Sequence, residues 1–330
     1  MDLIQQFKQK AAREIQTVVF PEGEDERILS AAVMAAKEGF VRSVALGDPE
    51  IIRQTAGKAG LSLDGVAVID PKSAPKLDAY ATRYVKDRPE MSESIARRVL
   101  RKRLAFGGMM VAAGDANAMV AGADSATASV IQAAAMTIGF APGISIASSF
   151  FVMVVPEFLG EQNKLFVFAD CAVNVQPTAS ELAQIAVTTG RSARSLLGME
   201  PKIALLSFSS KGSASHADVD KVLAALEEAR KIDPGLDIDG ELQGDAAIVP
   251  LVAAKKVKQS SVAGKANVLI FPDLDAANIA YKLTQYLAKA QAYGPILQGF
   301  ARPCSDLSRG ATAADVVGTA AITAVLAQSS

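Results

Sequence analysis

The segment DLSRGATAAD, at residues 306–315, brings together side chains that can bind anions and transfer protons. Arg309 carries a guanidinium, a group well suited to holding a phosphate, and the carboxylate of Asp315 can accept a proton. The hydroxyl of Ser308 can orient a nucleophile by a hydrogen bond. Thr312 and Asp315 also form a T-x-x-D capping pattern before an apolar run. The segment therefore predicts a capped terminal helix, a site that binds phosphate, or both.

Two other loops between a predicted strand and a predicted helix are rich in small polar residues. They read AGADSATAS at 121–129 and SFSSKGSASH at 207–216. Amides at a helix N-terminus, hydroxyl donors and a nearby cation make a natural anion site. Ser, Thr and Gly are also ordinary residues of caps and turns. We expect these loops to contact substrate through Ser125, Thr127, Ser209, Ser210 and Lys211.

The composition restricts the kinds of site that the chain can form. With one histidine, His216, and two cysteines, Cys171 and Cys304, it has too few ligands for a multi-histidine or structural zinc site, so we expect no metal. A Ser-His-Asp triad would depend on His216, which lies in the predicted first turn of a helix. The motifs G-x-G-x-x-G, G-x-x-x-x-G-K-[ST] and G-x-S-x-G are absent. No nucleotide cofactor is therefore indicated.

The charge balance and the apolar runs limit the partners and the cellular location. The 34 basic and 35 acidic residues give a net charge of −1, without the basic excess of a nucleic-acid-binding protein. The longest apolar runs are too short to span a bilayer, and the first residues, MDLIQQFKQKAARE, lack the apolar core of a signal peptide. Two cysteines fit a reducing compartment. We expect a cytoplasmic protein with no nucleic-acid or membrane partner.

The elements that must position these side chains alternate along the chain. Short β-branched runs are followed by helical stretches, which predicts an α/β fold with largely parallel sheets. Gly/Pro turns at 139–143 and 292–297 are candidate domain boundaries. If the chain crosses at both, residues 1–143 and 296–330 form domain I and residues 144–295 form domain II. We then expect the ligand in the cleft between them.

Several helices have clear local signals. The final helix is predicted to begin near Thr312, and Thr178 with Glu181 predicts a capping box for another helix. The stretch ESIARRVLRKRLAFGGMMVAAG, residues 93–114, is predicted as a long helical region that breaks at its glycine pair.

Seven segments, in order along nearly the whole chain, resemble phosphate acetyltransferase (phosphotransacetylase) in the short form without extra N-terminal domains. This group is part of the phosphate acetyl/butyryltransferase family. The segments are FPEGEDERIL (20–29), DANAMVAGADSAT (115–127), ADCAVNVQPTASELAQIA (169–186), LLSFSSKGSASHADVDKV (205–222), DGELQGDAAI (239–248), FPDLDAANIAYKL (271–283) and GPILQGFARPCSDLSRG (294–310). The resemblance implies acetyl transfer between coenzyme A and inorganic phosphate to give acetyl phosphate, with coenzyme A as a substrate and no permanently bound cofactor. It also implies two α/β domains with an interdomain cleft, as in isocitrate and isopropylmalate dehydrogenases, and a homodimer.

The resemblance implies a role for each residue of the C-terminal trio. Asp315 would accept the proton of the coenzyme A thiol, Ser308 would orient the sulfur, and Arg309 would bind the acyl phosphate and stabilise charge on the carbonyl oxygen. The thiolate would attack the carbonyl directly in a ternary complex. Since an ordinary carboxylate is a poor base for a thiol, we expect Asp315 to need a perturbed environment or very favourable geometry.

The chain departs from the family pattern at positions that would contact anions. Family members often have an arginine where this chain has Gln132, and a second arginine upstream, where VKDRPE offers Lys86 or Arg88. Loss of a charged hydrogen bond weakens anion binding about ten- to a hundredfold. Either the substrate differs or another cation compensates, and the candidates are Arg88, Arg302 and Lys211. We expect both Gln132 and Arg302 in the substrate site.

Three other activities stay open at this point. A phosphate acyltransferase could prefer propionyl or butyryl groups, because one methylene gives only about 1–3 kcal/mol of discrimination. The chain could also be a non-catalytic acyl-CoA-binding module, although it keeps the catalytic trio. A metal-dependent decarboxylating dehydrogenase on the same fold would need a carboxylate cluster and a nicotinamide site, for which the sequence has no fingerprint.

Overall fold

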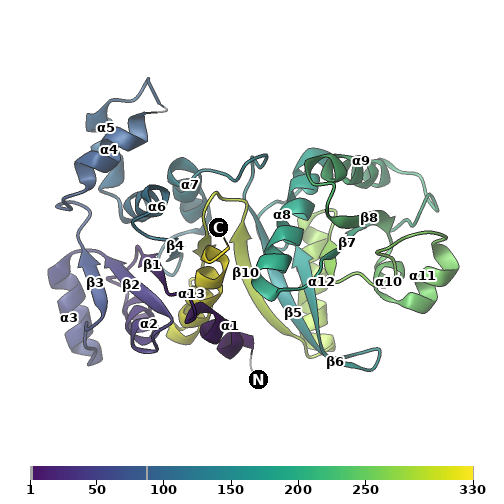
Figure 1. The fold of residues 1–330 in the computed structure, drawn as a ribbon, viewed down its shortest axis with the longest axis horizontal. Helices are drawn as coiled ribbons and strands as arrows, with labels where there is room; N and C mark the ends of the chain where they lie inside the picture. The colour runs from purple at the N-terminus through teal and green to yellow at the C-terminus, as the bar shows by residue number, and fades with distance from the viewer. Residues whose placement is uncertain (1–2, 87, 330) are drawn as a thin grey trace. The chain divides into compact units, whose positions relative to one another are not determined.

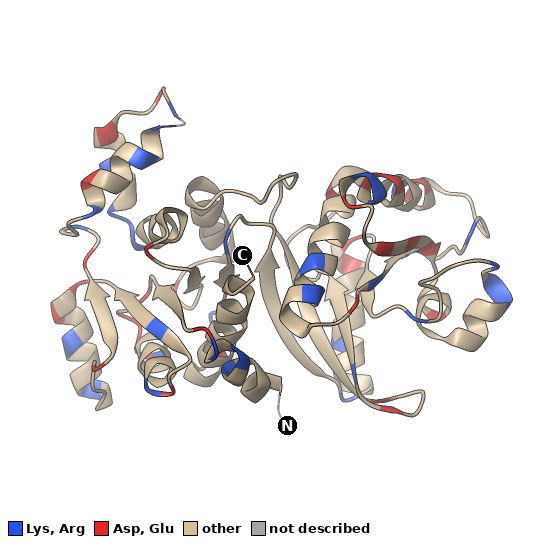
Figure 2. Ribbon diagram, viewed as in Figure 1, with Lys and Arg blue, Asp and Glu red and all other residues tan. Residues whose placement is uncertain are grey.

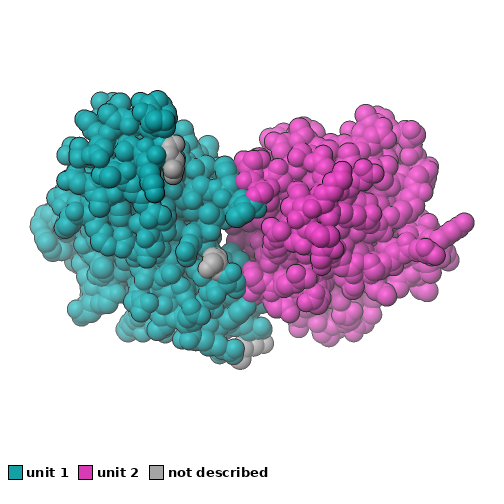
Figure 3. Space-filling view, turned by 45° about the horizontal axis from the view of Figure 1, so that its top comes forward, with its two compact units in different colours: residues 1–142, 300–330 teal, residues 143–299 magenta. Residues whose placement is uncertain are grey.

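Each of two compact units of the chain is built around its own β-sheet. The computed structural model describes residues 3–86 and 88–329. Residues 1–142 and 300–330 make up unit 1, and residues 143–299 make up unit 2 (Figure 3). Helices cover both sheets, which confirms the predicted α/β class with largely parallel strands. Within the described residues, no helix is long and apolar enough to cross a membrane.

Five strands of unit 1, counted within its described residues, form one parallel sheet in the order β11-β4-β1-β2-β3 (Figure 1). Parallel strands that are covered on both faces are apolar throughout rather than alternating. Val18, Val19 and Phe20 follow that rule, since none of them has exposed surface. The strands are β1 Gln16–Phe20, β2 Val41–Leu46, β3 Val66–Ile69, β4 Ala118–Ala121 and β11 Cys304–Asp306.

Helices cover both faces of the unit 1 sheet. α2 and α13 pack against one face, and α6 packs against the other (Figure 1). α1 packs on α13, and α4 and α5 form a hairpin that rests on α6. The helices are α1 Leu3–Ala11, α2 Glu26–Lys37, α3 Pro49–Ala59, α4 Leu77–Val85, α5 Glu93–Leu100, α6 Arg103–Ala113, α7 Thr127–Thr137 and α13 Ala313–Ala327.

The helical region predicted at 93–114 is broken, but the predicted position of the break was wrong. α5 ends at Leu100 and α6 begins at Arg103, so the break falls at residues 101–102 and the glycine pair lies inside α6. Three consecutive basic residues lie here: Arg101 and Lys102 form the break, and Arg103 is the first residue of α6. Figure 2 shows the Lys and Arg residues of both units in blue.

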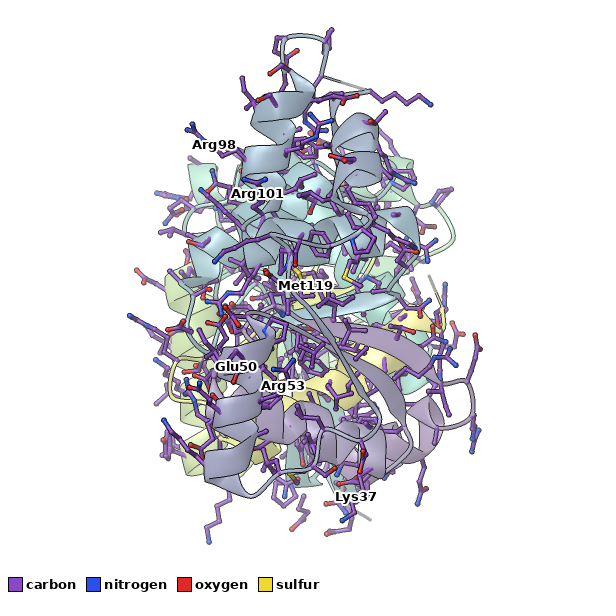
Figure 4. The ribbon with its side chains drawn as sticks, turned by 90° about the vertical axis from the view of Figure 1, so that its left-hand side faces the viewer. Lys37, Glu50, Arg53, Arg98, Arg101 and Met119 are labelled. Atoms are coloured by element: carbon purple, nitrogen blue, oxygen red, sulfur yellow. The ribbon has the colours of Figure 1, made fainter. Side chains whose placement is uncertain are left out.

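The glycine pair lets α6 approach its neighbours closely. A Cβ at Gly108 would lie 2.0 Å from Oγ1 of Thr137 in α7, and a Cβ at Gly107 would lie 3.2 Å from the sulfur of Met119 in β4. Met119 lies in the interior of the unit (Figure 4). Close packing therefore overrides the low helix propensity of glycine at both positions.

Unit 2 contains a mixed sheet, whose described strands follow the order β10-β5-β6-β9-β7-β8. β5 pairs antiparallel with β10 and β6, and the remaining pairs are parallel. β10 runs through Gly294-Pro295, in the stretch considered as a domain boundary, and its pairing with β5 continues to Gln298. The strands are β5 Ser148–Phe158, β6 Glu161–Ala169, β7 Lys202–Leu206, β8 Asp237–Leu242, β9 Val268–Ile270 and β10 Gln291–Gln298.

The helices of unit 2 begin where local signals place them. α8 and α9 pack together on the sheet, and α12 packs on β5, β6 and β10. The predicted capping box of Thr178 and Glu181 is confirmed at the start of α8. His216 is the N-cap of α9, where its Nδ1 accepts the N–H of Asp218 at 3.2 Å. The helices are α8 Ala179–Leu197, α9 Ala217–Ile232, α10 Gly244–Ile248, α11 Pro250–Lys256 and α12 Leu274–Leu287.

Candidate active site

Three loops of unit 1 meet at the carboxyl edge of its sheet. The adjacent parallel strands β1, β4 and β11 end at Phe20, Ala121 and Asp306, and each continues into a loop. Neighbouring parallel strands end at the same edge, which is where open α/β sheets bind ligands. The predicted trio follows β11, and the predicted loop at residues 125–127 follows β4.

Glu22 fixes the loop after β4 to the loop after β1. Its side chain is almost fully buried. Oε2 accepts the N–H groups of Gly122 and Ala123, both at 2.9 Å, and Oε1 accepts the N–H of Asp124 at 3.2 Å. Hydrogen bonds to a carboxylate are roughly twice as strong as neutral ones. The main chain at the end of β4 is therefore held firmly.

Arg27 joins all three loops. Its Nη1 donates to the carbonyl oxygens of Arg309 at 2.7 Å and Ala311 at 3.2 Å, and Nη2 donates to that of Ala123 at 2.9 Å. Asp25, the N-cap of α2, holds the guanidinium through Nε at 3.1 Å and Nη2 at 2.8 Å. The bond to Arg27 lowers the pKa of Asp25. Arg27 thus fixes the main chain that carries the trio, through the rigid fork of donors that only arginine offers.

Asp306 is a buried carboxyl group next to these loops. Its Oδ2 accepts the hydroxyl of Thr127, and Oδ1 has no hydrogen-bond partner in the described part of the chain. Burial, and to a smaller extent the charge of Glu22, raises the pKa of Asp306 to about 6. Gly122 packs against it with a φ of +116°, and a Cβ there would lie 2.3 Å from Oδ1. Thr127, predicted to contact substrate, gives its hydroxyl to this carboxyl group.

The trio lies on the turn before α13 and in the first turn of that helix. Ser308 and Arg309 are exposed, and Ser308 Oγ accepts the N–H of Gly310 at 3.3 Å. The predicted cap is confirmed: Thr312 Oγ1 accepts the N–H of Asp315 at 3.2 Å, and Asp315 Oδ2 accepts the N–H and hydroxyl of Thr312 at 2.9 and 2.8 Å. Asp315 Oδ1 has no hydrogen-bond partner among the described residues. One oxygen of Asp315 therefore serves the cap and the other is open to a ligand.

A cavity of about 640 Å³ lies beside α7, and we call it the Gln132 pocket. The loop before α7 contributes Ser125, and α7 contributes Ser129 and Gln132, whose spacing of three residues places them on one helix face. Lys102, in the connection between α5 and α6, and Arg103, the first residue of α6, also line the pocket. The pocket thus contains two cations that the sequence did not predict for this site.

The arginines predicted to compensate for Gln132 lie elsewhere in unit 1. Arg88 and Arg302 line a different cavity, of about 580 Å³, together with Lys86. Arg88 stacks on the ring of Tyr84, 4.2 Å from its centroid, and donates to backbone oxygens of α4 and α7. Neither Arg88 nor Arg302 is among the residues that line the Gln132 pocket.

The polar loop at residues 207–216 forms hydrogen bonds and an ion pair with other residues of unit 2. Lys211 Nζ lies 2.6 Å from Oδ1 of Asp239, and the hydroxyl of Ser209 donates to Glu241 at 2.8 Å. The hydroxyl of Ser210 accepts a backbone N–H at 2.9 Å. These bonds give the loop a structural role in unit 2.

Sequence reasoning missed residues that organise this site. Glu22 and Arg27 lie in FPEGEDERIL, which we singled out only for its family resemblance. The usable signal was a cluster of charges directly after a buried strand, since loops after parallel strands reach the ligand edge of a sheet. Lys102 and Arg103 lie in the part of the stretch 93–114 that was predicted as helix before the glycine pair, so no local signal placed them at a site.

Known proteins are similar to this chain in sequence and in fold. The model of the phosphate acetyl/butaryl transferase family matches residues 2–324. A phosphate acetyltransferase of Acetivibrio thermocellus is 48% identical over 330 residues, which cover 99% of both chains. A solved phosphotransacetylase from Streptococcus pyogenes is 42% identical, with a TM-score of 0.92, over 99% of this chain and 98% of its own.

A more distant structure shows the fold alone. The 4-hydroxythreonine-4-phosphate dehydrogenase of Klebsiella pneumoniae is 12% identical, with a TM-score of 0.53, over 94% of this chain and 98% of its own. This similarity agrees with the expected dehydrogenase-like architecture. From the match over nearly its whole length and the identity to its relatives, the chain belongs to the phosphate acetyl/butaryl transferase family.

Proposed function

We propose that this chain transfers an acetyl group between coenzyme A and inorganic phosphate, using Ser308, Arg309 and Asp315. Membership of the family supports the reaction class, and similar proteins carry the name phosphate acetyltransferase. The trio is complete and exposed at the carboxyl edge of the unit 1 sheet. A complete, exposed trio favours an enzyme over a non-catalytic acyl-CoA-binding module.

The main-chain geometry around Arg309 is the observation that carries this proposal. Arg27 fixes the carbonyl oxygens of Arg309 and Ala311, while the side chains of Ser308 and Arg309 remain exposed. Stabilisation of charge in a transition state requires donors that are already in place before the reaction. A rigid backbone with exposed functional groups meets that requirement.

The reaction follows in one direct transfer. In the direction of acetyl-CoA synthesis, the thiol gives its proton to Asp315 Oδ1, and the thiolate, oriented by Ser308, attacks the carbonyl carbon of acetyl phosphate. A carbon–sulfur bond forms and the carbon–oxygen bond to phosphate breaks. Its electron pair leaves with phosphate, which takes up the proton. Arg309 binds the phosphate oxygens and stabilises charge on the carbonyl oxygen. The cap uses only Oδ2 of Asp315, so both roles of this residue are compatible.

The residues around α7 support substrate binding in two ways. We propose that Ser125 and Gln132 contact substrate in the Gln132 pocket, which they line. Thr127 acts indirectly, because its hydroxyl positions Asp306. We propose that Arg302 binds an anionic group of a substrate in the separate cavity that it lines with Arg88 and Lys86.

An assay with three acyl donors tests the reaction. We expect phosphate- or arsenate-dependent release of coenzyme A from acetyl-CoA, unchanged by EDTA. Faster turnover with propionyl- or butyryl-CoA would show that the chain is instead a phosphate acyltransferase that prefers the longer acyl group. Absence of turnover with all three donors would reject the proposal, and loss of turnover on chelation would indicate a metal enzyme.

Substitution of Arg309 by alanine tests the site. We expect kcat to fall about a hundred- to a thousandfold, the usual effect of removing one group that stabilises developing charge. The thermal midpoint should stay near that of the wild type, because Arg27 binds the backbone of Arg309 rather than its side chain. Arg98→Ala removes an exposed arginine of α5 and should leave kcat unchanged. Equal activity of both variants would remove Arg309 from the mechanism.

The exposed face of α12 supports a homodimer. Ile279, Leu283, Tyr286 and Leu287 are more than half exposed, and their spacing of four, three and one residues forms one apolar stripe along the helix. Contiguous apolar stripes mark interaction surfaces. A second copy of the same helix offers a matching face about a two-fold axis, as isologous dimers do. We propose that α12 forms the dimer interface.

Charged substitutions on α12 test this interface. We expect Leu283→Glu combined with Leu287→Glu to shift the molar mass in light scattering from dimer to monomer. Leu251→Glu, at an exposed leucine of α11, provides the control and should remain dimeric. A wild-type protein that is monomeric at micromolar concentration would refute the proposal.

The cysteines support a cytoplasmic location. Cys171 and Cys304 are both free and buried, which agrees with a reducing compartment. We propose the cytoplasm as the location. Recovery of the protein in an extracytoplasmic fraction of its cells would contradict this assignment.

A further inference from the structure

Two cationic side chains line the Gln132 pocket despite its glutamine. Family members often carry an arginine at this position, and its absence predicted weaker binding of anions. Lys102 and Arg103 nevertheless line the same cavity as Gln132. The two cations lie at the start of α6, as its N-cap and its first residue, whereas Gln132 comes from α7.

We infer that Lys102, supported by Arg103, takes the place of the missing arginine and binds phosphate groups of coenzyme A in the Gln132 pocket. This inference rests on the proposed function, because it takes coenzyme A as the ligand.

Lys102 is fixed at its backbone and free at its side chain. It is the N-cap of α6, where its N–H donates to the carbonyl oxygen of Val99 at 3.1 Å and its own carbonyl accepts the N–H of Phe106 at 2.9 Å. Its side chain is exposed, and its ammonium group has no ion-pair or hydrogen-bond partner among residues 3–86 and 88–329. An unpaired ammonium on a flexible stem at the wall of a cavity suits a phosphate.

Arg103 contributes a more rigid charge. Its Nη1 forms an ion pair with Oε2 of Glu24 at 2.7 Å, and both side chains are partly buried. Glu24 is held in turn by the N–H of Asp48 at 2.8 Å. The ion pair orients the guanidinium and partly neutralises it, so Lys102 supplies most of the available charge.

The two carboxylates at the pocket do not cancel this charge. Glu22 lines the pocket, but its oxygens accept three backbone N–H groups, which compensate its negative charge. Asp124 is exposed to solvent, where water screens its interactions.

The size and lining of the pocket favour coenzyme A over inorganic phosphate. The volume of about 640 Å³ lies in the range of pockets for drug-sized ligands, about 300–1,000 Å³, and far exceeds one phosphate ion. Val99, Leu104 and Met136 add apolar surface to the lining. Coenzyme A carries phosphate groups and a long arm with methyl and methylene groups, so it matches these walls, whereas inorganic phosphate has no apolar part.

Substitution of Lys102 by glutamine tests the inference. We expect the Kd for coenzyme A, measured by calorimetry, and the KM for acetyl-CoA to rise about tenfold or more, with kcat and the KM for phosphate near their wild-type values. Arg98→Gln is the matched control, because it removes the same charge one turn earlier on α5, where Arg98 points into solvent (Figure 4). The control should bind coenzyme A like the wild type.

Substitution of Gln132 by arginine, alone and with Lys102→Gln, tests whether both positions serve one ligand. We expect Gln132→Arg to improve coenzyme A binding more in the Lys102→Gln background than in the wild type, so that the double variant regains most of the lost affinity. Two residues that share a partner show such coupling. An equal gain in both backgrounds would overturn the inference.

The remaining outcomes separate this inference from the proposed function. If the wild type binds coenzyme A without turnover, the proposed function fails, while the Kd of the Lys102→Gln variant still decides the inference. If the wild type turns over and Lys102→Gln binds coenzyme A with unchanged Kd, the inference alone is overturned. A raised KM for phosphate with an unchanged Kd for coenzyme A would also overturn it. A wild type that does not bind coenzyme A would reject both.

Discussion

Arg27 and Arg309 are joined by a hydrogen bond of 2.7 Å from the Nη1 of one to the carbonyl oxygen of the other, although 282 positions separate them in sequence. The bond uses the backbone of Arg309 and leaves its side chain exposed. The first turn of α2 therefore positions the loop before α13.

Arg27→Lys is expected to reduce turnover while the protein stays folded. One ammonium cannot replace the rigid fork that reaches three carbonyl oxygens, so the trio should shift. Displacements of about 1 Å can lower rates roughly a hundredfold, and we expect kcat to fall at least about tenfold. Arg42→Lys is the control, because Arg42 donates to the carbonyl oxygen of Ile15 away from the trio. Wild-type kcat in Arg27→Lys would show that this clamp is dispensable.

The two roles of Asp315 are expected to separate by mutation. Thr312→Ala removes the hydroxyl that accepts the N–H of Asp315, and should lower the free energy of unfolding by about 1 kcal/mol while most turnover remains. Asp315→Asn keeps an oxygen for the cap but cannot accept the thiol proton, and should lower kcat far more than stability. Chemical unfolding and steady-state kinetics of both variants provide the comparison. Normal turnover in Asp315→Asn would leave Asp315 as a cap only.

Asp306 is expected to make stability depend on pH. Its pKa is about 6 in the folded protein against a usual value of 3.8, so the folded state holds its proton more tightly than the unfolded state. The resulting contribution to stability is complete below pH 3.8 and is lost as the pH rises through 6. Relative to Asp306→Asn, the free energy of unfolding of the wild type should fall by about 3 kcal/mol across this interval. Urea unfolding of both proteins at about eight pH values between pH 3.5 and 7 measures this difference in the free energy of unfolding. A difference that is constant with pH would contradict the prediction.

Thr127→Val provides an independent check on the same carboxyl group. The hydroxyl of Thr127 donates to Oδ2 of Asp306 and lowers its pKa, opposing the effect of burial. Loss of this bond should move the fall in stability to higher pH. A shift to lower pH would show that Thr127 does not stabilise the charged form.

Gly108→Ala is expected to destabilise the protein. The added Cβ would lie 2.0 Å from Oγ1 and 3.0 Å from Cβ of Thr137, so α6 and α7 would have to separate. Overpacking of this kind costs about 1–3 kcal/mol. Gly57→Ala is the control, because its Cβ would meet nothing within 4 Å in α3, and it should stabilise by roughly 0.5–1 kcal/mol. Thermal midpoints of both variants should therefore move in opposite directions.

Features that depend on residues close together in the sequence could be predicted from the sequence. The capping boxes at Thr178 and Thr312 were predicted because each joins a residue to a partner three positions later. The α/β class followed from the alternation of strand and helix patterns. The break between α5 and α6 was misplaced, because the glycine signal is local whereas the close contact with Thr137 is tertiary.

The sequence by itself determined the class of fold, the capped start of α13 and, through family resemblance, the identity of the trio. Only the tertiary structure placed Arg27 against the backbone of Arg309, and Lys102 in the pocket of Gln132. Caps depend on local backbone geometry, which a short segment encodes. The clamp and the pocket depend on which strand ends and helix ends become neighbours, and that order is fixed only when the sheet of unit 1 assembles.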